Sequence, residues 1–524
     1  MRLVRRWVAE GYCMDTKEET AEEKGEQFCL ELFSRDIVHV PRSTSMSYMM
    51  RMPSYQVNGF FREYIVSRSM EENLVFALEG HCSVNKQHTG RHLAIGSTWD
   101  RDMSVYRGID LSRLRSLTVF GKWNPFFITD KMRLVRVLDL EDASSVTDCD
   151  LKLIVKLLPH LKFLSLRRCK EISHLPDSFG SLKQLQTLDI RHTSIVKLPQ
   201  STIKLQKLQH ICAGTAVPMY DDSSTVESIP PPLEATSAST SMSRPCDATL
   251  VSQLKSWRTR CIQEQPSCCN SGIELPRGIG KMMALHKITV VDVSIACGRP
   301  ILEELKNLTQ LRKLGLSGIK REICEALCSA IPAFIHLESL SLWLKKNQTG
   351  CLDAISSPPE KLKILKLYGY TGKLPAWIHM LSNLSKLKIQ KDMIMQDDVD
   401  LPNSLPKLNT LNLSSKEFQH GQFRFHPHFH QLQVLEINCN NRLQAVKFQP
   451  GVMPRIEVLR IFCHDVSSLR FSGLQQLINL RDVTLSGSYD ERVKQSLELE
   501  LGEYWQPTSS TSHGALVRWR RASL

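Results

Sequence analysis

The sequence has no long apolar segment. No run of residues approaches the roughly 18 consecutive apolar side chains that a membrane-spanning helix needs. The opening stretch MRLVRRWVAEGY carries charges but lacks the apolar centre of a signal peptide. These two absences predict an intracellular protein, cytoplasmic in the first instance, with the nucleus or the periphery of the plasma membrane as alternatives.

The 16 cysteines include no Cys-x-x-Cys pair. The closest clusters, Cys268-Cys269 and Cys324 with Cys328, do not have the spacing of zinc ligands. The other cysteines are scattered, and several fall at or beside strand positions, where a free cysteine behaves as a small apolar residue. This usage fits a reducing compartment better than a disulfide scaffold, and we predict no metal site.

Catalytic constellations are also missing. No Ser/His/Asp set, paired carboxylates or metal-ligand pattern stands out, so we predict that the chain is not an enzyme. His426, His428 and His430 could bind a metal weakly, but a loop inside a repeat is the favoured interpretation. The phosphate-binding motif GxxxxGK[ST] does not occur, and the nearest string, at residues 278–282, lacks the leading glycine and the hydroxyl.

Charge is unbalanced, with a formal net charge of +13. Such an excess suits an acidic partner, an anionic surface or nucleic acid, although many globular proteins carry it as scattered surface lysine and arginine. We do not expect nucleic acid to be a partner.

A Leu-x-x-Leu-x-Leu element recurs from about residue 110. The starting positions are separated by 21 to 26 residues, including four consecutive intervals of 24, and one gap of 77 breaks the period. The first apolar positions are Leu114, Val135, Leu161, Leu185, Leu208, Leu285, Leu311, Leu337, Leu362, Leu384, Leu408, Leu432, Ile456 and Leu480.

One repeat shows why the spacing implies a stacked fold. In the segment 384–389, Leu387 and Ile389 alternate with polar residues, as a short strand with one buried face requires. The return leg adds a second apolar signal, as in Leu198-Pro199 and Leu374-Pro375. A single unit cannot bury its leucines, so the units must stack, which predicts an α/β leucine-rich-repeat solenoid, curved, with parallel strands on the concave face.

Residues 1–70 have a different pattern. Thr20 and Glu23 form a plausible capping box ahead of an amphipathic helix, and an apolar stripe at 57–65 predicts another helix. Strand-like segments lie between them, at 37–40 and around Tyr48. Helices around a small hairpin suggest a partial winged-helix domain.

The predicted organisation follows from these patterns. A partial winged-helix domain occupies 1–70, a linker 71–109, the repeat domain 110–492 and a C-terminal tail 493–524. The gap in the period contains a Ser-, Thr- and Pro-rich stretch, so residues 215–272 are predicted to be a flexible insertion within one repeat.

The segment 2–12, RLVRRWVAEGY, resembles the winged-helix signature of plant intracellular nucleotide-binding leucine-rich-repeat immune receptors of the coiled-coil type. Thr20-Ala-Glu-Glu23 continues the resemblance, and Val57, Asn58 and Gly59 occupy the place of that family's Met-His-Asp motif. In the family this motif lies beside bound ADP. Gly59 offers no carboxylate and the phosphate loop is missing, so no cofactor is expected in this chain. ADP or ATP binding is expected only if a nucleotide-binding domain lies upstream.

The resemblance implies a non-catalytic recognition and regulatory module of a disease resistance protein. Such a module binds a pathogen effector, a guarded host protein or the receptor's own N-terminal domains, and restrains a nucleotide switch in defence signalling. The alternative is a substrate adaptor of a ubiquitin ligase, which also places repeats behind a small helical domain; an extracellular repeat receptor is less favoured.

Outward strand positions and the slot just after each strand are the predicted contact surface. Exposed aromatic side chains in that slot could anchor a partner, and lysines flank them. The candidate partner-binding residues are Trp343, Tyr368, Lys363, Lys366, Lys386, Lys388 and Phe462.

Overall fold

The computed structural model of this chain describes most of the sequence. The described residues are 2–39, 56–61, 64, 75–80, 90–214, 272–294, 298–345, 349–427, 429–439, 442–502, 505–510 and 516–521. The predicted insertion at 215–272 therefore lies outside the described residues except for its last position.

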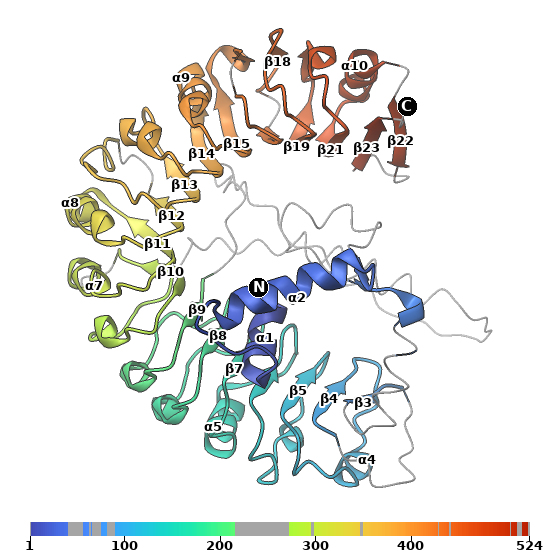
Figure 1. Cartoon of the computed structure of the whole chain (residues 1–524), viewed down its shortest axis with the longest axis vertical. Coiled ribbons are helices and arrows are strands. Elements are labelled where there is room, and N and C mark those ends of the chain that lie inside the picture. The colour runs from blue at the N-terminus through green and yellow to red at the C-terminus, as the bar shows by residue number, and fades with distance from the viewer. Residues whose placement is uncertain are drawn as a thin grey trace, which may run out of the picture. The chain divides into compact units, whose positions relative to one another are not determined.

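One long parallel sheet organises the repeats, each strand pairing with the next repeat's strand (Figure 1). The fourteen predicted repeats each supply one strand, which confirms the periodicity. The strands are β5 (Ser116–Val119), β6 (Val137–Asp139), β7 (Phe163–Ser165), β8 (Thr187–Asp189), β9 (His210–Cys212), β10 (Lys287–Asp292), β11 (Lys313–Ile319), β12 (Ser339–Leu344), β13 (Ile364–Tyr370), β14 (Lys386–Ile394), β15 (Thr410–Phe418), β17 (Val434–Cys439), β19 (Val458–Ser467) and β21 (Asp482–Tyr489).

Two further strands precede the predicted repeats. β3 (Val75–Leu78) and β4 (His92–Ile95) extend the same parallel sheet before β5. They lie in the segment 71–109, for which the sequence suggested a linker. Leu78, Leu93 and Ile95 are buried, so this segment contributes to the repeat core although its leucines do not follow the full motif.

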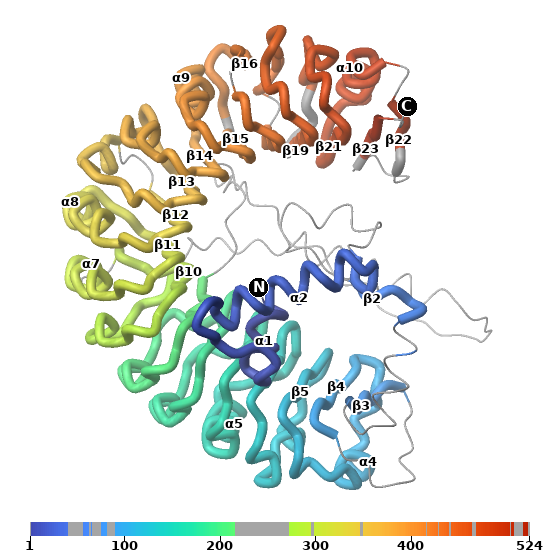
Figure 2. The backbone as a smooth tube through the Cα atoms, viewed as in Figure 1, coloured from blue at the N-terminus to red at the C-terminus, as the bar shows by residue number. Residues whose placement is uncertain are grey.

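The core is continuous from repeat to repeat. Leu387 and Ile389 of β14 are both fully buried, and they belong to one cluster that extends from Leu78 to Trp519. The return legs close each turn with short helices, visible as the outer coils of Figure 2. These are α4 (Met103–Arg107), α5 (Asp148–Leu157), α7 (Gly298–Leu305), α8 (Arg321–Ala330) and α9 (Gln396–Asp400), with 3-10 turns at η1 (Pro125–Phe127), η2 (Asp177–Ser181), η3 (Gln200–Lys204), η4 (Ile279–Lys281), η5 (Ile331–Ala333), η6 (Ala376–Met380), η7 (Leu401–Ser404), η8 (Gln419–Gly421) and η9 (Leu474–Gln476).

A small second sheet forms on the return legs of the last repeats. β16 (Gln422–Phe425), β18 (Ala445–Phe448) and β20 (Arg470–Ser472) pair in parallel. Phe425 stacks on Phe448 with ring centroids 5.3 Å apart. Extended return legs thus replace helices in this part of the solenoid.

The 77-residue gap does not interrupt the sheet. His210 of β9 pairs directly with Lys287 of β10. The return leg resumes at Ile273, and the Leu198 amide donates a hydrogen bond to the Glu274 carbonyl at 3.0 Å. Gly272 has room for no side chain, because a Cβ there would lie 2.4 Å from the Ser317 Oγ. The close packing at Gly272 therefore fixes the position at which the chain rejoins the parallel sheet.

The C-terminal segment caps the sheet. After α10 (Glu491–Leu501), β22 (Trp505–Ser510) and β23 (Leu516–Arg521) form an antiparallel hairpin, and β23 pairs with β21. Trp519 is 1% exposed. The sequence analysis separated residues 493–524 from the repeats as a C-terminal tail. In the structure, alternating Val517 and Trp519 of this segment cover the core that the last repeat would otherwise expose.

The N-terminal segment is a small helical region. α1 (Arg2–Glu10) is followed by α2 (Ala21–Ser34), and the predicted capping box of Thr20 and Glu23 is present. β1 (Val38–His39) pairs antiparallel with β2 (Gln56–Val57), so Val57 belongs to a strand and not to the helical stripe expected there. Most of that stripe, and the strand expected around Tyr48, lie outside the described residues.

In the part of the chain that the structure describes, no helix is long and apolar enough to cross a membrane.

We predict that Leu387→Ala will lower the free energy of unfolding by about 2–5 kcal/mol, because it leaves a cavity in a fully buried site. Leu134→Ala is the matched control, since Leu134 is 50% exposed and should change stability by less than about 0.5 kcal/mol. Urea denaturation followed by circular dichroism measures both. Equal effects of the two variants would contradict the assigned core.

Candidate partner-binding surface

The strand face carries the outward side chains in rows across the sheet. Because the strands are parallel and in register, Lys287 of β10 faces Lys313 of β11, and Lys366 of β13 faces Lys388 of β14. Neighbouring strands lie about 4.8 Å apart, so side chains in one row are close neighbours. Residues 22 to 26 apart in sequence thereby form one surface.

Five lysines of these rows form a lysine ladder, defined as Lys287, Lys313, Lys366, Lys386 and Lys388. In the described part of the chain, no carboxylate forms an ion pair with any of them. Lys363, by contrast, lies just before β13 and pairs with Glu338 at 3.2 Å. The structure therefore places Lys363 at the rim of the ladder.

Burial and the crowding of like charges destabilise the protonated forms of Lys313, Lys366 and Lys388. Burial, with the nearby charges of Lys287 and Lys366, lowers the pKa of Lys313 to about 7. Burial, with the charges of Lys386 and Lys388, lowers the pKa of Lys366 to about 8. Burial also lowers the pKa of Lys388. The ladder is a site where an added negative charge would be stabilised.

Two aromatic residues lie beside the ladder. Trp343 and Tyr368 stack with centroids 4.6 Å apart and ring planes 8° apart, and the Lys388 Nζ lies 5.4 Å from the Tyr368 ring centre. Tyr368 is only 5% exposed, so the expectation of an exposed anchor is wrong for this residue. Trp343 remains half-buried. Tyr368 packs against one face of Trp343, and Trp343 is the more accessible of the two rings.

Phe462 does not join this group. It lies on β19, in register with Asn438 of β17, and three strands (β14, β15 and β17) separate it from β13. On this side of the sheet Glu436 accepts hydrogen bonds from Asn412 and from Arg460, the latter at 2.7 Å. Burial raises the pKa of Glu436, but these partners outweigh it and the pKa is lowered. The lysine ladder therefore ends before the strands on which Glu436 and Arg460 pair with each other.

The strand face before the ladder carries α1. Arg2 and Arg6 of α1 both form ion pairs with Asp139 of β6, and Arg2 also pairs with Glu141. Arg6 donates a second hydrogen bond to the Thr118 Oγ1 at 3.0 Å. Asp139 is 1% exposed, so its charge is compensated almost entirely by the helix.

A second network joins the helices to β9. The Arg5 Nε donates to Glu22 at 3.0 Å, and Glu22 lies 3.1 Å from the His210 Nε2. Burial lowers the pKa of His210 to about 4, so the imidazole is neutral near pH 7 and donates through Nε2. Burial raises the pKa of Glu22, but the hydrogen bonds and charges of His210 and Arg5 hold it well below its usual range.

Apolar contacts and a hydrogen bond complete the docking of α1. Ala9 is 1% exposed and packs in one cluster with Val137 of β6 and Phe163 of β7. The Tyr12 hydroxyl and the His92 Nε2 lie 2.7 Å apart. Sequence reasoning missed these contacts. The available signal was the basic stripe of α1 and the acidic residues at outward strand positions, but nothing linked the two segments.

The degenerate Met-His-Asp position has a local role. The Asn58 Oδ1 accepts a hydrogen bond from the Phe60 amide at 3.2 Å, and the Asn58 amide donates to the Ile37 carbonyl. Val57 is 37% exposed. The side chain of Asn58 is thus used to shape its own turn.

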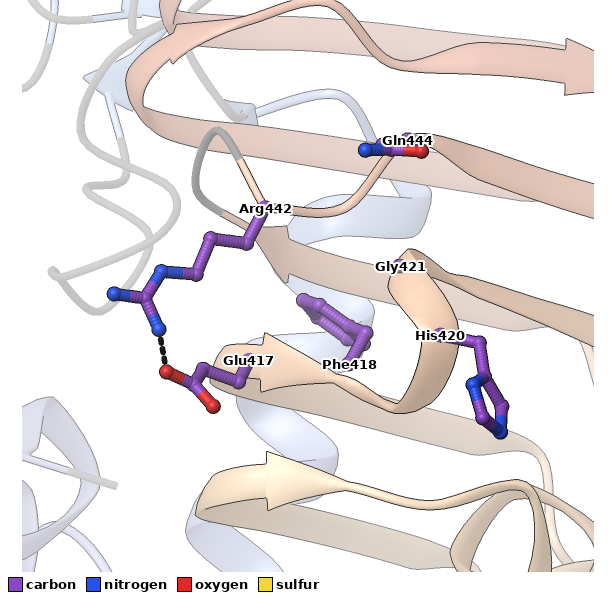
Figure 3. A pocket seen from close by; sticks show the side chains of 6 residues that line it. All are labelled: Glu417, Phe418, His420, Gly421, Arg442 and Gln444. Carbon is purple, nitrogen blue, oxygen red and sulfur yellow. Dashed lines mark ion pairs between the residues drawn. The ribbon is translucent and has the colours of Figure 1, made fainter.

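Figure 3 shows a pocket that is lined by Glu417, Phe418, His420, Gly421, Arg442 and Gln444, in which Arg442 and Glu417 form an ion pair. Nearby, the His426 Nδ1 lies 3.2 Å from the Gln449 Oε1, and His428 lies outside the described residues. Among the described residues no group of three His, Cys, Asp or Glu side chains could hold a metal ion.

The described cysteines are mostly free thiols. Cys13, Cys169, Cys212, Cys328, Cys439 and Cys463 are buried and not disulfide-bonded, and the Sγ atoms of Cys439 and Cys463 lie 3.7 Å apart. Cys324 of α8 and Cys351 are joined by a disulfide, with Cα atoms 5.3 Å apart. The sequence did not suggest this pair, because residues 27 apart are neighbours only once the repeats are stacked.

The profile of the family described as a leucine-rich repeat region matches residues 113–229 and 267–500. The chain belongs to the leucine-rich-repeat family. This assignment agrees with the period, the single strand per repeat and the continuous core. Regions of this family are in general interaction modules without catalysis of their own.

The leucine-rich-repeat chain is homologous to the C-terminal parts of plant disease resistance proteins. It is 28% identical over 418 residues to disease resistance protein Pik-2 of Oryza sativa subsp. japonica, covering 79% of this chain and 39% of the relative. It is 26% identical over 504 residues to disease resistance protein RGA4 of the same organism, covering 94% and 44%. A probable disease resistance protein RF9 of Arabidopsis thaliana is 22% identical, covering 87% and 39%. The chain spans less than half the length of these relatives.

Solved structures of leucine-rich-repeat proteins also resemble the chain. A Leptospira interrogans protein of this class matches at a TM-score of 0.39 and 14% identity, covering 76% of this chain and 89% of that one. A TDR receptor matches at a TM-score of 0.37 and 13% identity, covering 79% and 65%.

We predict that Lys313→Met will stabilise the protein near neutral pH. Between pH 7 and the usual lysine pKa of about 10.4, the unfolded chain holds a proton that folded Lys313 does not, so wild-type stability rises with pH. Methionine removes this penalty, so the variant should be more stable by about 1 kcal/mol at pH 6–7, allowing for solvent screening. The difference should vanish towards pH 10. Urea titrations across this range measure it; a gap independent of pH would contradict the charge assignment.

Proposed function

We propose that this chain is the recognition and regulatory part of a cytoplasmic plant disease resistance protein. Its strand face binds a pathogen effector or a guarded host protein, and its N-terminal helices connect that face to a nucleotide switch in the remainder of the receptor. Homology to the C-terminal parts of Pik-2 and RGA4 supports the first statement. The docking of α1 and α2 on the strand face supports the second.

The observation that carries the proposal is the pairing of Arg2 and Arg6 with the buried Asp139. A helix that compensates a buried carboxylate cannot leave without exposing that charge to solvent or to another cation. Removing one partner from a buried ion pair typically costs about 3–5 kcal/mol. Here the arginines are 25–30% exposed, so the cost is smaller and the contact is reversible.

Reversible docking allows regulation by differential binding. A protein ligand that prefers the strand face with the helices released shifts the population towards the released state. The shift is limited to the ligand's difference in affinity for the two states. The helices thus couple occupancy of the strand face to the segment that resembles a winged-helix domain.

We predict that Arg6→Gln will increase amide hydrogen exchange in α1 about tenfold, because it removes one ion pair and the hydrogen bond to Thr118. Asp139→Asn should act in the same direction from the sheet side. Asp142→Asn is the matched control, since Asp142 lies in the same repeat, is half exposed and pairs with Arg168 away from α1. Unchanged exchange in α1 for both Arg6→Gln and Asp139→Asn would overturn the docking.

Recognition is tested separately by a binding panel. Secreted pathogen proteins and host proteins are measured against the chain by biolayer interferometry, with Lys366→Glu as the face variant. Lys281→Glu is the control, because Lys281 lies on η4, within a return leg. We expect at least one ligand whose binding is lost only in Lys366→Glu. Ligands equally sensitive to both variants would place recognition elsewhere.

A further inference from the structure

The strand face divides into two parts of opposite character. Around β6 it presents the carboxylates of Asp139 and Glu141, which form ion pairs with Arg2 and Arg6 of α1. From β10 to β14 it presents the lysine ladder. In the described part of the chain no carboxylate forms an ion pair with these lysines, although the charge of Glu436 on β17 acts on Lys386 and Lys388 from one end. The first part shows how this face binds a segment of opposite charge.

We propose that the lysine ladder binds an acidic, extended segment of the partner protein, with an apolar or aromatic side chain of that segment resting on Trp343. The inference depends on the proposed function, since it specifies the chemistry of the protein that the strand face recognises.

The length of the ladder favours a peptide segment. Lys287 is only 8% exposed, so the accessible lysines run from Lys313 of β11 to Lys388 of β14, which is three strand spacings of about 4.8 Å, or about 14 Å. An extended chain rises about 3.3 Å per residue, so about four residues match this length. A single phosphate group could contact only two or three neighbouring lysines and would leave the rest uncompensated.

The aromatic pair favours a protein partner as well. Trp343 of β12 stacks on its in-register neighbour Tyr368 of β13, and the Lys388 Nζ lies 5.4 Å from the Tyr368 ring centre. A rigid, half-buried tryptophan beside a charged row provides an apolar contact at low entropic cost. Carboxylates over the lysines and one apolar side chain over Trp343 would complement both features together.

Binding of an acidic ligand should also increase the protonation of the ladder lysines. Near pH 7.5 the amino group of Lys313 is largely neutral, because burial and its lysine neighbours lower its pKa to about 7. A carboxylate placed beside it favours the charged form. Binding should therefore take up protons, which calorimetry in buffers of different ionisation enthalpy detects.

The test uses the whole chain and a labelled peptide of about eight residues, long enough to cover the ladder. The peptide alternates glutamate with glycine and contains one phenylalanine, and a second peptide has glutamine in place of glutamate. Fluorescence anisotropy measures binding at low and high salt. We expect the acidic peptide to bind and the glutamine peptide not to bind, with affinity falling as salt rises.

The face variant is Lys366→Met with Lys388→Met, and the control is Lys281→Met on η4. We expect the double variant to weaken peptide binding about tenfold or more while its melting temperature stays equal or rises, because charge crowding is relieved. A fall in affinity without a fall in melting temperature distinguishes lost binding from lost folding. Trp343→Ala should weaken the phenylalanine peptide more than a matched alanine peptide.

Three outcomes would overturn the inference. These are no binding of the acidic peptide, binding unchanged in the double methionine variant, and competition by inorganic tripolyphosphate as effective as the peptide itself. The last would make the ladder a phosphate site. None of these changes hydrogen exchange in α1, so the docking of the N-terminal helices is judged independently.

Discussion

The in-register stacking of one strand per repeat is the constraint on which the rest of the structure depends. Leu387 and Ile389 point inward because the core requires it, so the residues between and beside them must point outward. Stacking then converts a period of about 24 residues in sequence into a spacing of about 4.8 Å in space. Every row on the strand face, charged or aromatic, is a consequence of this conversion.

The same constraint concentrates charge. Lysines that would be independent in an unfolded chain become near neighbours on β10, β11, β13 and β14, and burial against the sheet removes part of their solvation. On β6, Asp139 is buried on the same face, and its carboxylate is compensated by Arg2 and Arg6 of α1 and by the Glu141 amide. The strand face is therefore an electrostatic surface with one part paired to helix α1 and one part whose lysines form no ion pair among the described residues.

Much of the solenoid could be predicted because it depends on local patterns. The fourteen strands, the return-leg leucines and the Thr20–Glu23 capping box each follow from residues close together in sequence. The predictions were wrong where distant segments decide the outcome. Trp519 looks like part of a C-terminal tail until β23 is placed on β21, and Tyr368 looks exposed until Trp343 is stacked over it.

The sequence by itself determined the repeat, its period, the family resemblance and the list of side chains that face outward. Each of these depends on the spacing of residues along the chain. Only the tertiary structure decided which of those side chains meet. Arg6 and Asp139 are 133 residues apart, and His210 and Lys287 are separated by the insertion, so no local rule pairs them. Packing brings these residues together, because only one register of each strand keeps its leucines inside the shared core.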